Sequence, residues 1–390
     1  MKEKEEMLQF DTDEEKPDKK LKDQIKTLKY ILILLIVIII ILILKLIPFS
    51  KLFCSKKGTE ILILKESDMS SMISMSDIIE ADKEALSIYS SQKSNIPLRS
   101  NLDIPEYKGQ CLFMNGYAAP AKALGVKIVS VYPENINKNL TSVPATMVLV
   151  DAETGMVNSL LDGTYLTRLR TGAISGLATD ILSRKDSKIF ALFGTGGQAV
   201  TQLEAVLTVR KIEEVRVFDV FKERAKEFAA KMTEKFGKKF NVKIIAAESS
   251  DKAVENADII TTVTTSKKPV FDANKVKKNV HINGVGSYTP EMQEIPGDIL
   301  VKANKIFVDT RDGAINESGD LIKPIQSGLI KKEKINGELG EVINGLMKGR
   351  ESDDEMTFFK TTGSAVLDLV AAQKIYEMAK SKKVGQMVDL

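Results

Sequence analysis

The sequence of 390 residues is poor in the side chains that build metal centres and disulfide frameworks. Its two cysteines, Cys54 and Cys111, cannot make a disulfide framework, and they favour a reducing compartment. A single histidine, His281, excludes a zinc site with two or more histidines, so we predict no metal. A Ser-His-Asp triad would have to use that one residue. Proton transfer therefore falls to lysine, carboxylates, tyrosine or water.

A surplus of charge of one sign is also missing. The chain has 56 basic and 53 acidic residues, which leaves a net charge of +3. No RNP-like, zinc-knuckle or basic-helix pattern is present, so we expect no nucleic-acid partner. The length is enough for about two domains.

The first 29 residues contain few large apolar side chains. Seventeen of them are charged, with both signs mixed. Such a segment cannot bury enough apolar surface to offset the entropy lost on ordering. We therefore expect residues 1–29 to form a charged, mostly disordered tail.

One long hydrophobic run follows, YILILLIVIIIILIL at residues 30–44, before Lys45 interrupts it. A membrane-spanning helix needs about 20 apolar residues, and residues 30–48 reach about that length if Lys45 snorkels to the interface. We predict a single-pass membrane anchor at 30–48. The alternatives are a buried helix or strand and a cleaved signal peptide, whose n-region would be unusually long and acidic. Lysines flank both ends, so orientation stays open.

The segment ALFGTGGQAVTQ, residues 191–202, combines an apolar run, a glycine cluster and a helix-compatible stretch. The run at 187–193 predicts a buried strand, and 198–209 predicts a helix. The glycine cluster fits the pattern G-x-G-x-x-[GA], in which the residues permit a tight turn, close approach to a pyrophosphate and close helix packing. We interpret it as a dinucleotide site rather than a structural turn. The predicted contacts are Gly194, Gly196, Gly197, Gln198 and Ala199.

The next strand ends near Asp219, whose carboxylate can accept hydrogen bonds from both ribose hydroxyls. It would repel a 2′-phosphate, so we predict NAD(H) in preference to NADP(H). Further apolar runs at 241–248, 257–265 and 278–286 predict a doubly wound parallel sheet. Ligands bind at the carboxyl ends of such strands, which adds Thr262, Val285, Gly286 and Ser287 as cofactor contacts. His281 begins one of the strands, and we expect it to pack rather than catalyse.

Several segments match one family. They are PLR (97–99), GVKIVSVYPEN (125–135), LVDAETG (149–155), LLDGTYLTRLRTGAISGLATDIL (160–182), FGTGGQA (193–199), HINGVGSYTPEMQEI (281–295), GELGEVINGL (337–346) and FKTTGSAVLDLVAA (359–372). From about residue 60 to the C-terminus the chain resembles the ornithine cyclodeaminase/mu-crystallin family.

The resemblance implies an α/β subunit of two domains. A Rossmann-type domain (176–324) is inserted between two parts (58–175 and 325–390) of an α+β domain for substrate binding and dimerisation. Family members bind NAD(P) and act on small L-amino acids or their imines, so we expect a small amino-acid or imino-acid substrate and a homodimer. Nicotinamide cofactors reside mainly in the cytosol, which favours a cytosolic catalytic domain.

The resemblance also assigns site residues. Arg99 and Arg170 look like the arginines that bind the substrate carboxylate, and a guanidinium suits this task because its fork donates two parallel hydrogen bonds. Lys127 looks like the pocket lysine. From the strand pattern alone it is either an edge-strand gatekeeper or a desolvated amine with a lowered pKa. The small residues after Arg170 are expected to let a helix N-terminus approach phosphate or carboxylate oxygens. The remaining predicted cofactor neighbours are Thr146, Arg170, Thr171 and Gly363.

One departure from the family pattern separates two chemistries. Cyclodeaminases carry an aspartate and, shortly after, a lysine in the loop that follows the HINxVG strand, and this chain has Tyr288 and Met292 there. Cyclisation of ornithine requires a carboxylate base at the amine, and a tyrosine with a pKa of about 10 is a poor replacement. Reduction of a preformed ketimine needs only a bound carboxylate, a hydride and a proton from Lys127 or from a water that it orients.

We therefore predict an NAD-dependent reductase of a ketimine of the pyrroline or piperideine carboxylate type, or an L-amino-acid dehydrogenase. Two alternatives stay open. One is ornithine cyclodeaminase, which makes proline and ammonia. The other is a non-catalytic, membrane-tethered protein that binds NAD(P)H or a small ligand, as in the mu-crystallin branch.

Overall fold

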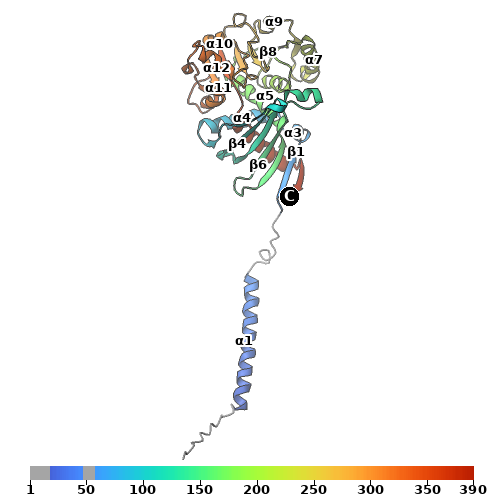
Figure 1. The fold of residues 1–390 in the computed structure, drawn as a ribbon, viewed down its shortest axis with the longest axis vertical. Coiled ribbons are helices and arrows are strands. Elements are labelled where there is room, and N and C mark those ends of the chain that lie inside the picture. The colour runs from blue at the N-terminus through green and yellow to red at the C-terminus, as the bar shows by residue number, and fades with distance from the viewer. Residues whose placement is uncertain (1–17, 47–57) are drawn as a thin grey trace, which may run out of the picture. The chain divides into compact units, whose positions relative to one another are not determined.

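The computed structural model describes residues 18–46 and 58–390. They belong to two separate units, Met1–Gly58 and Thr59–Leu390, shown in Figure 1. Residues 1–17 of the predicted tail and residues 47–48 of the predicted anchor lie outside the described residues.

A single helix, α1 (Lys19–Leu46), forms the described part of the first unit. Its 28 residues give a length of about 42 Å. Within Lys19–Ile43, an 18-residue window has a mean hydropathy of 2.7 and none of this window is buried, so the helix can cross a membrane by length and composition. A signal sequence near the N-terminus meets the same criteria. The helix begins at Lys19, so the expectation of disorder is wrong for residues 19–29. Their lysines and leucines favour helix, and adding turns to an existing helix costs little.

The second unit begins with a mainly antiparallel sheet in the order β16-β1-β7-β6-β5-β4-β2, with β3 paired to β4. The first and last strands of this unit pair with each other, which places the C-terminus beside β1 (Figure 1). The strands are β1 (Glu60–Leu64), β2 (Ser94–Asn95), β3 (Ser100–Ile104), β4 (Gly109–Ala118), β5 (Ala123–Val131), β6 (Ala145–Val150), β7 (Val157–Asp162) and β16 (Gln386–Asp389).

Helices cover only one face of this sheet. They are α3 (Glu66–Met72), α4 (Met75–Ser90), α5 (Gly163–Leu182) and α14 (Ala365–Lys382). Alternate residues of β5 and β6, such as Lys127 and Met147, point into the core beneath α4, α5 and α14. The start of α5 is fixed by Asp162, whose side chain accepts hydrogen bonds from two backbone amides of the first turn.

The second sheet is entirely parallel, in the order β10-β9-β8-β11-β12-β15-β13-β14. The predicted doubly wound sheet is confirmed, and its strand order reverses between β8 and β11. Apolar cores lie against it in two separate clusters. The strands are β8 (Ile189–Phe193), β9 (Glu214–Phe218), β10 (Lys243–Ala246), β11 (Ile259–Thr262), β12 (His281–Gly284), β13 (Lys305–Val308), β14 (Gly337–Glu338) and β15 (Thr357–Lys360).

The helices of this half are α6 (Ala199–Val209), α7 (Lys222–Met232), α8 (Lys238–Phe240), α9 (Ser250–Val254), α10 (Gly297–Lys302), α11 (Arg311–Glu317), α12 (Gly319–Gln326) and α13 (Leu339–Ile343). The predicted domain boundary at residue 324 differs from this arrangement. Strands β14 and β15 follow that boundary in sequence and yet belong to the parallel sheet, while α14 and β16 pack on the first sheet.

Helix α5 connects the two sheets because it packs against β6, β12 and α6. Its small residues make this possible. A Cβ at Gly172 would lie 2.5 Å from the carbonyl oxygen of Thr201, and one at Gly176 would lie 3.0 Å from the Cβ of Ala205. The segment RTGAISG therefore lies in the middle of α5 and not at its N-terminus. Its small side chains let the first turns of α6 approach the helix that carries Arg170.

Candidate active site

The glycine turn after β8 has the geometry of a nucleotide cradle. Gly194 has a φ of +98°, and a Cβ there would lie 2.8 Å from the carbonyl oxygen of Val263, so only glycine fits this tight turn. A Cβ at Gly196 or Gly197 would meet nothing within 4 Å, which leaves the backbone open to a ligand. The chain then enters α6 at Ala199, which is completely buried. These are the mechanical roles that the sequence pattern predicts.

Asp219 follows β9 and lies against the same turn. Its Oδ2 accepts hydrogen bonds from the backbone amide and the hydroxyl of Thr195, at 3.2 and 2.7 Å. Two polar atoms near this turn, the Oε1 of Gln198 and the hydroxyl of Thr262, are buried and have no hydrogen-bond partner among the described residues. Buried polar groups normally have partners, so this set of residues fits a bound dinucleotide.

The other predicted cofactor residues lie at the neighbouring strand ends. Thr262 ends β11, and its carbonyl oxygen accepts hydrogen bonds from the amides of Val285 and Gly286, at 3.0 and 3.2 Å. Because β8, β11 and β12 are adjacent, these residues share one edge of the sheet with the glycine turn. His281 is buried and hydrogen-bonded to Thr357 and Asn283, as expected of a packing residue, and burial lowers its pKa to about 3.

A buried charged cluster that sequence reasoning missed holds these loops in place. The carboxylate of Glu294 accepts hydrogen bonds from three backbone amides of the loops after β11 and β12, those of Thr264, Gly286 and Ser287. Asp320 in turn accepts a hydrogen bond from the amide of Glu294 and pairs with Lys360 at 3.1 Å. Burial and the Asp320 charge raise the pKa of Glu294 to about 7. Glu294 is in the motif HINGVGSYTPEMQEI, but the sequence does not reveal its partners.

A second buried network lies at the first sheet and includes Lys127 of β5. Its Nζ donates a 2.6 Å hydrogen bond to Asp368 of α14, and the Nε of Arg170 donates to the other carboxylate oxygen at 2.9 Å. The Lys127 side chain is 1% exposed. Burial lowers its pKa to about 7, although the Asp368 charge acts in the opposite direction. Strand β5 is an inner strand, so the gatekeeper alternative is wrong and the desolvated amine is confirmed.

Two aspartates of this network were not predicted. Asp368 lies within the apolar run of α14, and Asp82 lies on the buried face of α4. Both oxygens of Asp82 are buried, and within residues 18–46 and 58–390 neither has a hydrogen-bond partner. Burial raises its pKa well above the usual value, and the nearby Asp368 carboxylate raises it further. A lone carboxylate inside an apolar helical pattern is the sequence signal for both residues.

Arg99 lies in the loop before β3 and is partly exposed. Its Nη2 donates a 2.6 Å hydrogen bond to Glu317 at the end of α11. Burial raises the pKa of Tyr288, and the charge of Arg99 acts against this rise. Tyr288, at the position where the cyclodeaminases carry aspartate, therefore lies close enough to Arg99 to sense its charge. Glu317 was not predicted.

Gly363 lies against Arg170. It has a φ of +81°, and a Cβ there would lie 2.8 Å from the guanidinium Nη1. The turn is held by Asp309, whose Oδ2 accepts hydrogen bonds from the amides of Thr362 and Gly363 at 3.0 and 2.9 Å. Thr171 follows Arg170 in α5, and its carbonyl oxygen accepts a hydrogen bond from Gln202 of α6. Arg170 thus lies between Lys127, with which it shares Asp368, and helix α6, which its neighbour Thr171 contacts.

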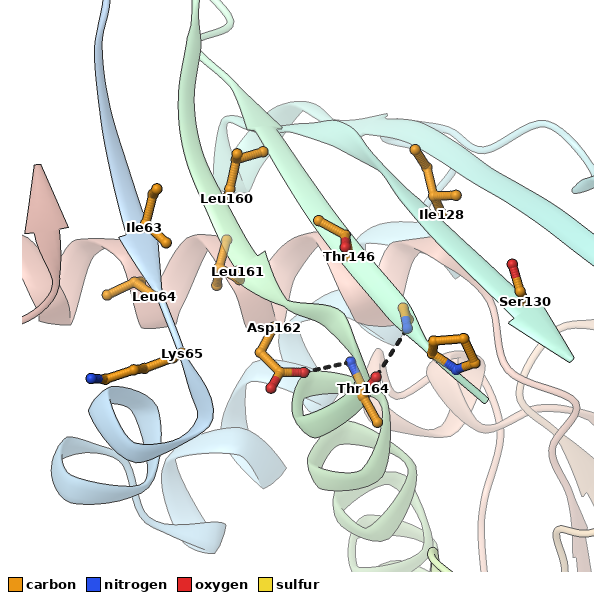
Figure 2. Close-up of a pocket in the computed structure, with 12 residues that line it drawn as sticks. Ile63, Leu64, Lys65, Ile128, Ser130, Thr146, Leu160, Leu161, Asp162 and Thr164 are labelled. Carbon is orange, nitrogen blue, oxygen red and sulfur yellow. Dashed lines mark hydrogen bonds between the residues drawn. The ribbon is translucent and has the colours of Figure 1, made fainter. Parts of the chain in front are cut away.

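Thr146 is the one predicted site residue that the chain places elsewhere. It lies at the start of β6, exposed, on the face of the sheet opposite Lys127. This face is hollowed into a groove of about 570 Å³. Figure 2 shows its Ile63, Ile128 and Leu160 side chains on the strands, with the pale red helix α14 behind them. Within one chain, Thr146 does not reach the glycine turn.

The site thus combines a nucleotide cradle with two arginines and a lysine whose pKa is close to 7. Such a set can bind a dinucleotide and the carboxylate of a small acid. Among residues 18–46 and 58–390, no group of His, Cys, Asp and Glu side chains is arranged to hold a metal ion.

Comparison with known proteins agrees with this reading. The model of the ornithine cyclodeaminase/mu-crystallin family matches residues 59–383. A Delta(1)-pyrroline-2-carboxylate reductase of Bacillus cereus is 39% identical over 329 residues, 84% of this chain and 100% of the relative.

Two solved structures are similar over the same region. One is the Thermococcus litoralis Delta(1)-pyrroline-2-carboxylate reductase in complex with NADH and L-proline, with a TM-score of 0.80, 40% identity, and coverage of 84% of this chain and 100% of that one. The other is an archaeal alanine dehydrogenase dimer with bound NAD, with a TM-score of 0.78, 37% identity, and coverage of 85% and 99%. This protein belongs to the ornithine cyclodeaminase/mu-crystallin family.

Proposed function

We propose that the protein is an NAD(H)-dependent reductase of small cyclic ketimines that carry a carboxylate beside the C=N group, or that it interconverts an L-amino acid and its imine. The observation that carries this proposal is the buried network of Lys127, Asp368 and Arg170 beside an open dinucleotide cradle. The similar proteins named as pyrroline-2-carboxylate reductases and alanine dehydrogenase support it.

In this proposal the cations bind the substrate. Arg170 and Arg99 hold its carboxylate, and the Lys127 ammonium adds a third positive charge. The cradle from Gly194 to Ala199, together with Asp219 and the strand-end residues, holds the cofactor, which supplies the hydride. A substrate that already contains C=N needs no carboxylate at position 288, where this chain has Tyr288.

The direct test is an assay of the full-length protein that follows NADH absorbance and ammonia release together. With pyrroline-2-carboxylate or piperideine-2-carboxylate we expect steady NADH consumption without ammonia. The cyclodeaminase alternative predicts proline and ammonia from ornithine with no net change in NADH. Failure to consume NADH with any ketimine, or with any 2-oxo acid and amine, would leave the non-catalytic alternative in place.

We infer a preference for NAD(H) from Asp219, whose carboxylate faces the glycine turn. In Asp219→Ser the charge that opposes a 2′-phosphate is gone, together with an acceptor for the ribose hydroxyls. NADH should bind roughly tenfold more weakly, a loss of about 1.4 kcal/mol, and NADPH should bind no worse. Fluorescence titration of both cofactors measures the ratio. An unchanged ratio of the NADH and NADPH affinities would mean that the ribose does not contact Asp219.

A pH dependence follows from Lys127. Its pKa is about 7, so the ammonium is present below this pH and is lost as the pH rises through it. We expect kcat/KM to fall above about pH 7. Asp368→Asn removes the charge that raises the pKa of Lys127, so the fall should begin at lower pH.

Asp82→Asn is the matched control for this measurement. Asp82 lies in the same core, burial raises its pKa well above the usual value, and among the described residues its carboxyl group makes no hydrogen bond to Lys127. The fall in kcat/KM should therefore begin at the same pH in Asp82→Asn as in the wild type. If kcat/KM of Asp368→Asn falls at the same pH as in the wild type, with the fold confirmed by thermal unfolding, then Lys127 does not cause the fall.

We also propose a homodimer in which the first sheet and its helices bind the substrate and the partner. The uncovered sheet face in Figure 2 supports this, because its Ile63, Ile128 and Leu160 side chains form an apolar surface that a second copy can bury. The similar alanine dehydrogenase is named as a dimer.

Helix α1 supports a further proposal, that the protein is attached to a membrane by one span with a cytosolic catalytic unit. Each large apolar side chain from Tyr30 to Ile43 is at least 44% exposed, a surface unfavourable in water. A cleaved signal sequence would leave a mature chain without α1, so N-terminal sequencing of the native protein separates the two.

A further inference from the structure

The inference concerns the proton that the substrate nitrogen must receive, and it rests on the proposed function. The cyclodeaminases carry an aspartate for this nitrogen in the loop where this chain has Tyr288. Lys127 carries a proton, but its side chain is 1% exposed and its hydrogen bond is made to Asp368. The structure holds another carboxyl group in a better place, on a different element.

That group is Glu317, the last residue of α11. Its Oε2 accepts a 2.6 Å hydrogen bond from Arg99, and its side chain is 22% exposed. The position that a Cβ at Gly313 would occupy is 3.9 Å from this Oε2 and 3.1 Å from the hydroxyl of Thr362, so the carboxyl group lies near the turn 362–363. The next residue of that turn, Gly363, contacts Arg170.

The surroundings of Glu317 shift its pKa upward. Burial raises its pKa, the Asp309 carboxylate raises it further, and the Arg99 guanidinium lowers it. The Thr362 hydroxyl lies beside this carboxyl group and acts to lower its pKa. Glu317 is therefore a partly exposed carboxyl group at the place where Arg99 and Arg170 converge on a substrate carboxylate.

We propose that Glu317 is a catalytic residue that binds the substrate nitrogen and exchanges its proton, in place of the family aspartate at position 288. In a 2-carboxy ketimine the nitrogen and the carboxylate are attached to the same carbon. A carboxyl group hydrogen-bonded to the arginine that holds the substrate carboxylate is therefore within reach of the nitrogen.

The proton and electron balance is simple. The O–H bond of Glu317 breaks as an N–H bond forms on the imine. The imine carbon then takes a hydride from the reduced nicotinamide, and the π pair of the C=N bond becomes the lone pair of the amine. Glu317 is left as a carboxylate that can pair with a protonated amine, and water restores its proton because the side chain is partly exposed.

Because the carboxylate recognises nitrogen, two probes of the same shape separate this role from a structural one. L-proline has a ring nitrogen, and cyclopentanecarboxylate has carbon in its place. In the presence of NAD⁺, the wild type should bind L-proline more tightly than cyclopentanecarboxylate by calorimetry. Glu317→Gln should weaken L-proline about tenfold or more and should leave cyclopentanecarboxylate equal or tighter. Glu317→Asp should restore part of the preference.

Asp312→Asn is the matched control, because Asp312 lies on the same helix, is exposed, and makes no contact with Arg99 among the described residues. It should bind both probes as the wild type does. In the reductase assay Glu317→Gln should lose about 10²-fold or more in kcat, the usual range for an acid–base residue.

Three results would overturn the inference. Equal losses of both probes in Glu317→Gln would mean that the residue only positions Arg99. A Glu317→Gln enzyme with wild-type kcat would exclude the proton role while leaving the proposed function intact. A wild type without preference for L-proline would exclude nitrogen recognition. By contrast, a wild type that consumes no NADH with any ketimine would contradict the proposed function itself.

Discussion

The structure depends on one buried carboxylate. Asp368 accepts hydrogen bonds from Lys127 and Arg170, and all three side chains are at most 6% exposed. A buried charge is tolerated only when its partners compensate for lost hydration, so removal of one member leaves an unpaired charge and costs about 3–5 kcal/mol. The three residues come from α14, β5 and α5. The same interaction that joins these elements also places two cations side by side, and the Asp368 charge opposes the burial that lowers the pKa of Lys127 to about 7.

Helix α5 connects this network with the glycine turn, because it packs against α6. Gly172 and Gly176 bring it within van der Waals distance of α6, whose N-terminus faces the glycine turn. Arg170 lies on the same helix, two residues before Gly172. The distance between the buried Lys127–Asp368–Arg170 network and the glycine turn is therefore set by the packing of α5 against α6. A fixed distance suits a reaction in which donor and acceptor atoms must be held in close, oriented contact.

The sequence predicts the parts of the molecule that depend on local pattern. The strands, the glycine turn and the helix after it each have a signal within a few residues, and the structure confirms these elements. The role of Asp219 as the ribose contact stays a prediction. Arg99, Arg170 and Lys127 came from family resemblance, and the burial of Lys127 agrees with its strand position.

What the sequence could not predict depends on long-range contacts. The pairing of Asp368 with Lys127 joins residues 241 positions apart, and that of Arg99 with Glu317 joins residues 218 positions apart. The domain boundary at 324 was wrong because β14 and β15 join the parallel sheet by pairing with distant strands. Thr146 lies on the sheet face opposite Lys127, and only the pairing register shows which face of the sheet a residue occupies. Its role as a cofactor neighbour stays a prediction. Residues 19–29 are helical because they extend an apolar helix.

The central claim is that one small carboxylate lies between the cations at Asp368 and a nicotinamide held by the glycine turn. A crystal structure of the protein with NAD⁺ and L-proline tests it most directly. We expect density for the dinucleotide along residues 194–199, and for the proline carboxylate on Arg170 and Lys127 with its ring against the nicotinamide. Proline bound away from both cations, or a nucleotide outside this turn, would contradict the account.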